Sequence, residues 1–590
     1  MPRERVLAYG HMHSPSLLDL PERAGSWGRF LPHVLLAAIT FALYSSSLYF
    51  YFVWDDFPYV VNNYRIQQLN WESLRAIWTT TYLSHYAPVH HTVYVLTHAV
   101  FGLNPFGYHL VQLLLHVACV LLAYELICRL ERPAVAFLAG LLFAVHPTNV
   151  ETVAWISESK STLAFFFFLI SFRYFIRLRE RGRWMDGLLA GLFHALSMLA
   201  KINTVVAPVI FLLYDYRSGA SLKNLKWKSL LAYFSLSGIM TLVHLGAFHG
   251  GAQQIEREYM GGAGTHVLNL PLLLSFYLQM IVFPHPLSAW QMFPVEEGVT
   301  ALVVLGWLGL AAMSLFLFRA GRRIQFWGLW IFVFLLPVLQ IIPFNIWVAD
   351  RYLYIPGIGG FVLLSELLLW LRGRLRERAA QWGLEAAFAS ALLLMGWQTY
   401  RHVPIWTNDL TLWAATTPTC MTSAYCHTNL GLALLQSGQT EQGIEELRRA
   451  VEIHPHPGYL ELLGDAYTMA AGNYPEALRA YQEALNRSGQ EPGKAIFGKV
   501  ARAHLLAGNL PQAAQAIEAG KKFNPQDPGL WIAAGIWEWK SGNTAAAREA
   551  IQKALLLSGG TPNPAGYLTE FWGKPAEVGQ FLAELSLRKN

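Results

Sequence analysis

The most constraining feature of the sequence is a series of long apolar stretches separated by short loops. The first, residues 34–53, contains no Asp, Glu, Lys or Arg. At about 1.5 Å per residue, a helix of this length crosses a hydrocarbon core of about 30 Å. A soluble chain of 590 residues, with 54% hydrophobic and 14% charged residues, would leave too much apolar surface in water. The sequence therefore predicts an integral membrane protein.

The apolar stretches predict about eleven membrane-spanning helices. After the first, which is too long for a signal-peptide core, they cover residues 108–128, 134–147, 161–176, 186–200, 203–214, 229–247, 299–318, 325–344, 353–371 and 384–400. One more segment, 268–283, is interrupted by Pro271 and closed by Pro284 and Pro286. This proline pattern favours a re-entrant hairpin or a half-buried helix. We expect an all-α membrane domain over residues 34–400.

Basic residues gather in alternate loops of this predicted bundle. The four clusters are Arg177, Arg179, Arg181 and Arg183; Lys223, Lys226 and Lys228; Arg319, Arg322 and Arg323; and Arg372, Arg374, Arg376 and Arg378. Short cytoplasmic loops collect Lys and Arg. All four clusters are cytoplasmic if residues 1–33 are cytoplasmic as well. The outer side then holds the loop 54–107, the stretch after His146, the loop 248–268, the turn 345–352 and everything after residue 400.

A repeat occupies the C-terminal part of the chain. Gly438, Gly472, Gly508 and Gly542 are 34, 36 and 34 residues apart. Each is followed at fixed spacing by small residues, among them Gly443, Ala477, Ala513 and Ala547. The pattern resembles the tetratricopeptide repeat, in which small residues let two antiparallel helices approach closely. We expect a linker over 401–423, an α-solenoid of about four repeats over 424–557, and a capping segment over 558–590.

Two adjacent carboxylates, Asp55 and Asp56, follow the first predicted helix. They repel each other and are unfavourable near lipid, so a purely structural helix end gains little from them. Such a pair can act as a general base on a hydroxyl, or bind a divalent cation such as Mg²⁺ or Mn²⁺ through its oxygens. The alternative interpretation is a solvated turn that ends the helix.

Cationic and imidazole side chains return to the same predicted face. Lys201 lies between two apolar stretches, where an unpaired ammonium is unfavourable, so we expect an anionic partner. Arg351 can form charge-assisted bonds with a phosphate. The other polar residues predicted there are His85, His90, His91, His146, Glu151, Glu158, Lys160, Asp350 and Tyr352. The histidine spacing is not a zinc pattern. Each residue alone also fits a polar contact between helices.

The remaining composition excludes some classes of function. A formal charge of +6 is modest for this length and does not indicate nucleic-acid binding. The four cysteines form no CxxC pattern and predict no disulfide framework. Cys420 and Cys426 can pair only if the backbone between them turns.

Several motifs together resemble a known family. They are WDDFPYVVNN (54–63), HYAPVHHTVYVLTHAVFGLNPFGYHLVQLLLH (85–116), FAVHPTNVETVAWISESKSTLAFFFFLISF (143–172), AKINTVVAPVIFLLYDY (200–216), ADRYLYIPGIGGF (349–361) and WTNDLTLW (406–413). In this order they are similar to polytopic GT-C glycosyltransferases with C-terminal tetratricopeptide repeats, typified by the transmembrane O-mannosyltransferases and their bacterial relatives.

The resemblance implies inverting transfer of a sugar, with mannose favoured, from a polyprenyl-phosphate-linked donor to a hydroxyl outside the cytoplasm. Asp55 or Asp56 would be the base. Arg351, Lys201 and Lys160 lie in the matched stretches, and we assign them to the donor phosphate on physical grounds, because cations bind it favourably. The supporting polar residues would be His90, His91, His146, Glu151, Asp350 and Tyr352. The acceptor would be a protein bound by the repeats.

Two other classes of function compete with this interpretation. A non-catalytic membrane scaffold would use only the repeats, and a transporter would show two inverted halves, for which the sequence gives no convincing symmetry. For location, we expect a bacterial inner membrane with periplasmic repeats, or an endoplasmic reticulum membrane with lumenal repeats if the source is eukaryotic.

Overall fold

The computed structural model describes residues 30–83, 85–220, 225–248, 262–341, 346–488, 493–558 and 564–585. Within these ranges the fold is helical, as predicted, with one isolated β-bridge between Tyr82 and His85. The chain forms two compact units, one ending at Leu412 and the other beginning at Trp413. Most of the predicted cytoplasmic N-terminal segment, Lys223, and most of the loop 248–268 lie outside the described residues.

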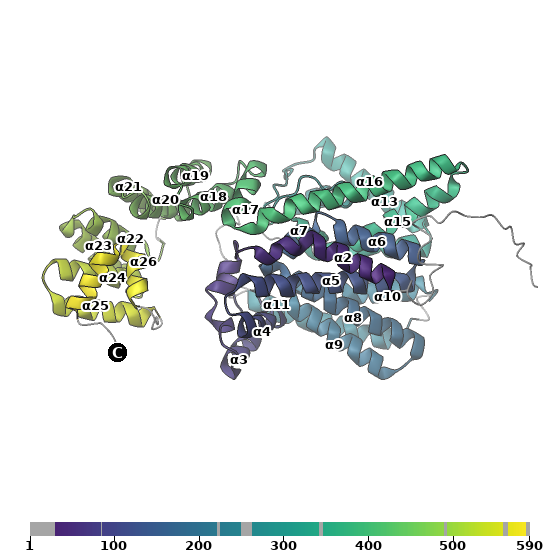
Figure 1. Ribbon diagram of the computed structural model, residues 1–590, viewed down its shortest axis with the longest axis horizontal. Helices are drawn as coiled ribbons and strands as arrows, with labels where there is room; N and C mark the ends of the chain where they lie inside the picture. Colours follow the sequence, from purple (N-terminus) through teal and green to yellow (C-terminus); the bar gives the residue numbers. More distant parts are fainter. Residues whose placement is uncertain are drawn as a thin grey trace, which may run out of the picture. The chain divides into compact units, whose positions relative to one another are not determined.

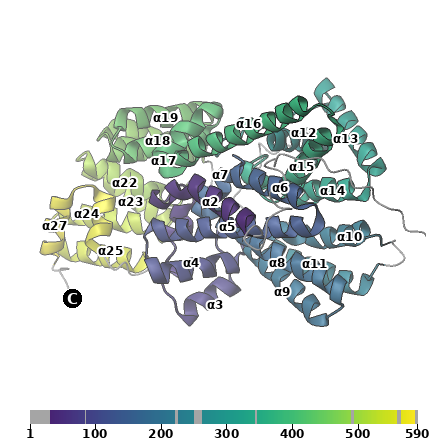
Figure 2. The ribbon, with the colours of Figure 1, turned by 45° about the vertical axis from the view of Figure 1, so that its right-hand side comes forward.

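The first unit is a bundle of α-helices with short helical turns between them (Figures 1 and 2). Its α-helices are α2 (Leu31–Tyr44), α3 (Trp71–Thr79), α4 (Pro88–Phe101), α5 (Pro105–Leu130), α6 (Pro133–Val145), α7 (Asn149–Ala154), α8 (Ser159–Arg181), α9 (Trp184–Ala200), α10 (Ala207–Arg217), α11 (Trp227–Phe248), α12 (Ala263–Val282), α13 (Ala301–Arg319), α14 (Arg322–Leu335), α15 (Gly357–Arg374) and α16 (Arg378–His402).

The shorter turns of this unit carry much of the polar chemistry. They are η3 (Ser45–Tyr49), η4 (Phe57–Val61), η5 (Tyr64–Ile66), η6 (Ile156–Glu158), η7 (Ile202–Val206), η10 (Leu336–Val338), η11 (Asp350–Leu353) and η12 (Val403–Thr407). Most of them interrupt or terminate longer apolar helices, which brings polar side chains to helix ends.

Six helical segments of the described chain are long and apolar enough to cross a membrane. They are Leu31–Tyr49, Pro105–Leu130, Ile156–Arg181, Trp227–Gly246, Ala263–Val282 and Ala301–Arg319. The other predicted spans also contain helices, of which α6 and α9 are shorter apolar helices, and residues 342–344 of the predicted span 325–344 lie outside the described residues. Length and composition therefore establish a membrane protein with several apolar helices, and the count of eleven spans stays a prediction.

The segment around Pro271 is one continuous helix. Helix α12 runs from Ala263 to Val282 with Pro271 inside it, so the predicted re-entrant hairpin is wrong. One proline removes a single backbone donor, and an apolar face that packs well can outweigh that loss. Leu273, Leu274 and Tyr277 provide this buried face. Helix α12 is long and apolar enough to cross a membrane, and the alternative prediction, a half-buried helix, stays a prediction.

Aromatic side chains fill the centre of the bundle. Phe168 and Phe172 of α8 pack against Trp330 of α14. Helix α15 approaches α14 closely because Gly359 has no side chain: a Cβ there would lie 2.5 Å from the Trp327 carbonyl oxygen. This close packing holds η11, at the N-terminal end of α15, in a fixed position.

The second unit consists of antiparallel helix pairs. Its α-helices, together with α17 (Asp409–Thr416) at its start, are α18 (Ala424–Gln436), α19 (Thr440–Ile453), α20 (Pro457–Met469), α21 (Tyr474–Arg487), α22 (Ile496–Leu506), α23 (Leu510–Phe523), α24 (Pro528–Lys540), α25 (Thr544–Leu557), α26 (Pro564–Trp572) and α27 (Pro575–Glu584). The first eight form four consecutive pairs, as the repeat predicted.

The repeated glycines lie in the turns within each pair. Gly438, Gly472, Gly508 and Gly542 have φ angles of +81°, +62°, +79° and +85°. Only glycine adopts this left-handed conformation readily, so it ends the first helix of each pair and reverses the chain. The 34-residue spacing therefore marks a turn that every repeat requires.

The segments flanking the repeats are more ordered than a linker and a tail. Residues 401–423, expected as a linker, include η12, α17 and η13 (Thr417–Thr419). Cys420 and Cys426 form a disulfide, contrary to the prediction that the cysteines form no disulfide framework. The backbone turns at Cys420, whose carbonyl accepts a hydrogen bond from Ser423 N, and this turn brings the two sulfurs together. The described part of the capping segment is the hairpin α26–α27.

Candidate active site

The two adjacent acids lie in a strained turn between η3 and η4. Trp54, which precedes them, has a positive φ of 51°, an unfavourable conformation for a bulky residue. The Trp54 backbone N–H donates to Asp409 Oδ1 at 2.7 Å, and its ring stacks on Trp155 with centroids 4.5 Å apart. These contacts fix the direction in which Asp55 and Asp56 leave the backbone.

Asp56 is a buried structural anchor. Its Oδ1 accepts hydrogen bonds from Ser157 N at 2.8 Å and Ser157 Oγ at 2.5 Å, and its Oδ2 accepts from Val53 N at 3.1 Å. The side chain is fully buried, and burial raises the pKa of Asp56 to about 7. Asp56 therefore ties the first loop to the turn that precedes α8, with both oxygens already occupied.

Asp55, in contrast, is only partly buried. Burial raises the pKa of Asp55, while the nearby Lys160 ammonium and Arg351 guanidinium act in the opposite direction. The structure therefore brings Asp55 into the electrostatic range of two of the three predicted phosphate-binding cations.

Glu158 connects all three cations. Its carboxylate lies 2.9 Å from Lys201 Nζ, 3.3 Å from Lys160 Nζ and 3.6 Å from Arg351 Nε. Four elements supply these residues, because Glu158 ends η6, Lys160 lies in the first turn of α8, Lys201 follows α9, and Arg351 belongs to η11. The expected anionic partner of Lys201 is thus Glu158.

Arg351 is held by a second carboxylate. Its guanidinium pairs with Glu151 Oε1, and its backbone N–H donates to Glu151 Oε2 at 2.8 Å. The neighbouring Asp350 accepts hydrogen bonds from Gln291 Nε2 at 3.0 Å and from Ser288 N at 3.3 Å. Arg351 is therefore a buried, positioned cation and not a free one, which the sequence could not show.

A small cavity lies beside Lys201 and Arg351. It has a volume of about 30 Å³, enough for one or two waters. Ser161, Asn203 and Tyr352 contribute polar groups to its wall, and the apolar part of the wall comes from Ala164, Phe334, Tyr354 and Ile355. The cavity thus has both polar and apolar lining groups beside the two cations.

The predicted histidines pack beside this cluster in different ways. His90 Nε2 is 2.9 Å from Ser159 Oγ, and His146 contacts Thr148 Oγ1 and the Ile281 carbonyl. His91 is buried between the rings of Tyr59 and Tyr82 with neither ring nitrogen hydrogen-bonded.

His85 is exposed at the edge of the site. Across the described residues, no group of three or more His, Cys, Asp or Glu side chains is arranged to hold a metal ion.

Sequence reasoning named Glu158 without a role and missed Ser157 altogether. Both lie in the ISESK segment immediately before α8, where a Ser–Glu–Ser–Lys run at a helix start is unusually polar for a membrane domain. That local polarity was the available signal. Two of their contacts, Lys201–Glu158 and Ser157–Asp56, join residues 43 and 101 positions apart in the sequence.

Family models match both units of the chain. Residues 85–244 match the family described as dolichyl-phosphate-mannose-protein mannosyltransferase, and residues 428–495 and 468–528 match the tetratricopeptide repeat. Part of the first unit is thus similar to this mannosyltransferase family, and part of the second unit is similar to tetratricopeptide repeats. The resemblance predicted from the motifs is confirmed, and the predicted enzyme class, a glycosyltransferase, agrees with the family description.

The curated relatives are distant. The chain is 26% identical over 502 residues to human protein O-mannosyl-transferase TMTC1, covering 73% of this chain and 56% of that protein. Protein O-mannosyl-transferase F38B6.6 of Caenorhabditis elegans is 22% identical, covering 72% of this chain and 62% of that protein. Mouse protein O-mannosyl-transferase TMTC2 is 31% identical over a shorter region, 31% of this chain and 24% of that protein. The chain thus spans little more than half the length of the first two relatives.

Among solved structures, the chain is similar to one titled as the Cut9–Hcn1 hetero-tetramer of APC/C. The TM-score is 0.26 at 11% identity, covering 79% of this chain and 87% of that chain. Yeast Tom70 matches with a TM-score of 0.21 at 11% identity, covering 80% of this chain and 97% of that chain. Scores this low carry no argument about the fold or the function.

Proposed function

We propose that the chain transfers a mannosyl group from a polyprenyl-phosphate-linked donor to a hydroxyl of an acceptor on the outer side of the membrane. The observation that carries this proposal is a partly buried Asp55 carboxylate whose pKa is raised by burial and lowered by the charges of Lys160 and Arg351, two of the cations that Glu158 joins. A general base next to a set of cations is what attack by a hydroxyl and departure of a phosphate require.

In the proposed reaction, Asp55 accepts the proton of the acceptor hydroxyl. The acceptor oxygen forms a bond to the anomeric carbon as the bond between that carbon and the phosphate oxygen breaks, so the configuration inverts. Burial raises the pKa of Asp55 above its usual range, which makes its carboxylate a stronger base than an exposed one. Asp56 positions the loop through Ser157 and takes no part in proton transfer.

Lys160 and Lys201 are the proposed phosphate-binding groups. Their side chains are 19% and 17% exposed, whereas Arg351 is 6% exposed and paired with Glu151. An arriving phosphate would therefore meet the two ammonium groups first. Arg351 would act mainly by holding Glu151 and Glu158 and by adding positive charge beside the leaving group.

We assign Asp55 to proton transfer and not to metal binding. Both oxygens of Asp56 accept hydrogen bonds, from Val53 and Ser157, which hold this carboxylate in place within the loop. The proposed proton transfer needs only the Asp55 carboxylate.

The proposed topology keeps eleven spans with the basic clusters on the cytoplasmic side. Helix α12 qualifies as a span by length, but its ends contact two segments that are both predicted to be outer. His266 stacks on Trp347 at 4.8 Å near one end, and the Ile281 carbonyl contacts His146 near the other. A helix with both ends on one side does not cross, so the alternation of the basic loops is preserved.

The disulfide supports an outer position for the repeats. Disulfides persist in the periplasm, the endoplasmic reticulum lumen and outside the cell, and are rare in the cytosol. The Cys420–Cys426 bond lies at the beginning of the repeat unit. An outer repeat unit could bind a protein acceptor, and whether the compartment is periplasmic or lumenal stays a prediction.

A specific observation favours the competing proposal of a non-catalytic scaffold. Each of Lys160, Lys201 and Arg351 already pairs with a carboxylate. If these pairs only stabilise the fold, the cluster needs no donor and the repeats alone carry the function.

The two proposals are distinguished by an activity assay on the purified chain in detergent. Radiolabelled dolichyl-phosphate-mannose or undecaprenyl-phosphate-mannose is incubated with acceptor peptides containing Ser and Thr. We expect transfer by the wild type and by Glu72→Gln, an exposed substitution in the same outer loop. Asp55→Asn should lose nearly all transfer. Equal activity of Asp55→Asn and Glu72→Gln would remove the catalytic proposal.

A further inference from the structure

The inner face of the repeat unit is covered by the hairpin α26–α27. Within the repeats, the first helices of successive pairs, such as α22 and α24, pack on one another more closely than successive second helices do. In a curved stack the closer packed side is the concave side, which is the surface such proteins use for binding. Helices α20, α22 and α24 therefore line the inner face, and Figure 1 shows α26 beside α22 and α24.

Residues at the end of α26 contact three successive first helices. Arg502 of α22 lies over the Phe571 ring, 5.2 Å from its centroid, and also donates to the Phe571 carbonyl at 3.4 Å. At the start of α24, a Cβ on Gly529 would be 3.1 Å from the Phe571 ring. At the end of α20, Met469 Cε lies 3.0 Å from the position of a Cβ on Gly573. The hairpin thus follows the groove across three repeats.

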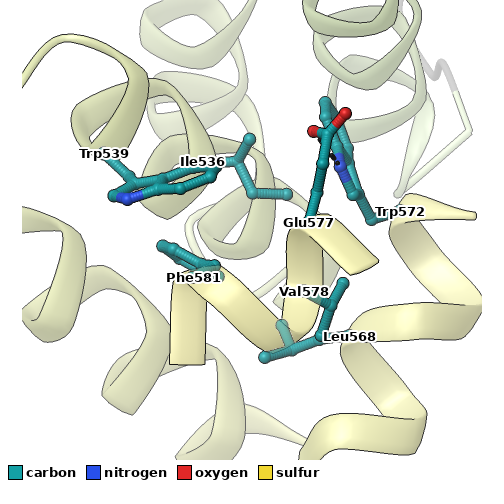
Figure 3. Close-up of a pocket in the computed structure, with 7 residues that line it drawn as sticks. All are labelled: Ile536, Trp539, Leu568, Trp572, Glu577, Val578 and Phe581. Carbon is teal, nitrogen blue, oxygen red and sulfur yellow. Dashed lines mark hydrogen bonds between the residues drawn. The ribbon is translucent and has the colours of Figure 1, made fainter. Parts of the chain in front are cut away.

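The apolar side of the hairpin packs into α24. Figure 3 shows Trp572, Val578 and Phe581 around Ile536 and Trp539. The space left between them is about 10 Å³, so the aromatic side chains fill this part of the groove almost completely.

Charged groups surround this apolar contact. Glu577 accepts a hydrogen bond from Trp572 Nε1 at 3.0 Å and lies 3.5 Å from Lys540 Nζ. Buried aromatic anchors with a polar rim are the usual anatomy of a protein-binding surface.

A role as a simple end cap does not account for these contacts. A capping helix covers the exposed side of the last pair, α24 and α25. Contacts with Arg502 and Met469 reach one and two repeats further back, along the surface where a bound peptide would lie. The hairpin therefore has the position of a ligand.

We propose that the inner face binds an amphipathic helix of a partner protein that carries an aromatic pair followed by a carboxylate. The chain's own α26–α27, with Phe571, Trp572 and Glu577, occupies this surface and competes with the partner. Arg502 and Lys540 would recognise the aromatic ring and the carboxylate of the partner, as they do those of the hairpin. This inference does not depend on the proposed transferase activity.

The hairpin is a strong competitor because it is covalently attached. Only a short connection joins Ser558, at the end of α25, to Pro564, at the start of α26. A short tether gives an effective concentration on the order of millimolar. A free peptide of moderate affinity should hardly displace the wild-type hairpin, so the test must weaken the hairpin first.

The experiment uses the full chain in detergent with a fluorescein-labelled synthetic peptide of residues 564–585. We expect the Phe571→Ala, Trp572→Ala double variant to bind this peptide about tenfold or more tightly than the wild type, measured by anisotropy. Leu556→Ala, a substitution of a 78% exposed side chain on α25, should behave like the wild type. A peptide carrying the same two alanines should not bind. Equal binding by wild type and double variant would overturn the inference.

Two further measurements locate the binding and separate an occupant from a folding cap. Adding Arg502→Gln to the double variant should weaken peptide binding, and unchanged binding would place the peptide elsewhere and overturn the inference. Hydrogen exchange of the double variant should show faster exchange on the inner face with α24 and α25 still protected. Loss of protection throughout α24 and α25 would show that the hairpin is needed for folding, and would equally overturn it.

Discussion

Substitution of the adjacent acids one at a time should separate catalysis from stability. Asp55→Asn removes a proton acceptor without removing a hydrogen bond that fixes the loop. General-base catalysis contributes about 10² to 10⁴-fold, or about 3 to 5 kcal/mol, so the turnover number should fall by that factor. The net charge of the cluster becomes more positive by one, so the KM for the anionic donor should decrease.

Asp56→Asn should mainly lower the stability of the protein and reduce turnover less than Asp55→Asn does. The amide oxygen of asparagine can still accept from Ser157, but its NH₂ group then faces the Val53 N–H, which loses its acceptor. One buried unsatisfied donor costs about 1 to 3 kcal/mol. We expect a lower unfolding temperature and a smaller loss of turnover than for Asp55→Asn.

The assay combines mannosyl transfer with thermal unfolding of the same detergent preparations, with Glu72→Gln as the control in the same loop. The expected result is a stable, inactive Asp55→Asn and a destabilised, partly active Asp56→Asn. A stable, inactive Asp56→Asn beside an active Asp55→Asn would refute the assignment, because the buried acid would then be the base.

Three other predictions concern the cations and the disulfide. Burial lowers the pKa of Lys201 to about 8, so its ammonium loses charge as the pH rises through 8, and the KM for the donor should rise over the same range. Lys201→Arg should flatten this rise, because arginine keeps its charge. A wild-type KM that does not change with pH would contradict the role of Lys201 in donor binding. Glu158→Gln leaves buried cations unpaired and should lower the free energy of unfolding by about 3 to 5 kcal/mol. Added donor should recover part of this loss. Thermal unfolding without and with donor measures the loss and the recovery. Cys420 and Cys426 should resist maleimide labelling in unfolded, unreduced protein, whereas the free thiols Cys119 and Cys128 should react. Peptide mapping separates the sites, and labelling of Cys420 or Cys426 without reductant would exclude the bond.

The membrane helices could be predicted because their signal is local. An uninterrupted apolar stretch becomes a helix wherever lipid or the protein core surrounds it, since the backbone must satisfy its own hydrogen bonds. The repeated glycines were equally informative, because each lies in a left-handed turn. Helix α12 was mispredicted because Pro271 signals a break only when packing does not compensate for the lost hydrogen bond.

The difference between the two acids could not be predicted. Asp55 and Asp56 are chemically identical neighbours, and what separates them is the positive φ of Trp54 and the hydrogen bonds from Ser157. Ser157 is 101 residues away in the sequence. A contact across that distance depends on how α5, α7 and α8 pack, which a local pattern does not contain.

The pairing of the cations has a further consequence for how a donor would act. The cluster contains Asp55, Glu151 and Glu158 against Lys160, Lys201 and Arg351, so its charges balance before any ligand arrives. A donor phosphate adds a negative charge and competes with Glu158 for both lysines. The carboxylates then face one another with less compensation, and a like charge nearby raises a carboxylate pKa. Donor binding should therefore make Asp55 a stronger base, so that the base is strongest when a sugar is in place to be transferred.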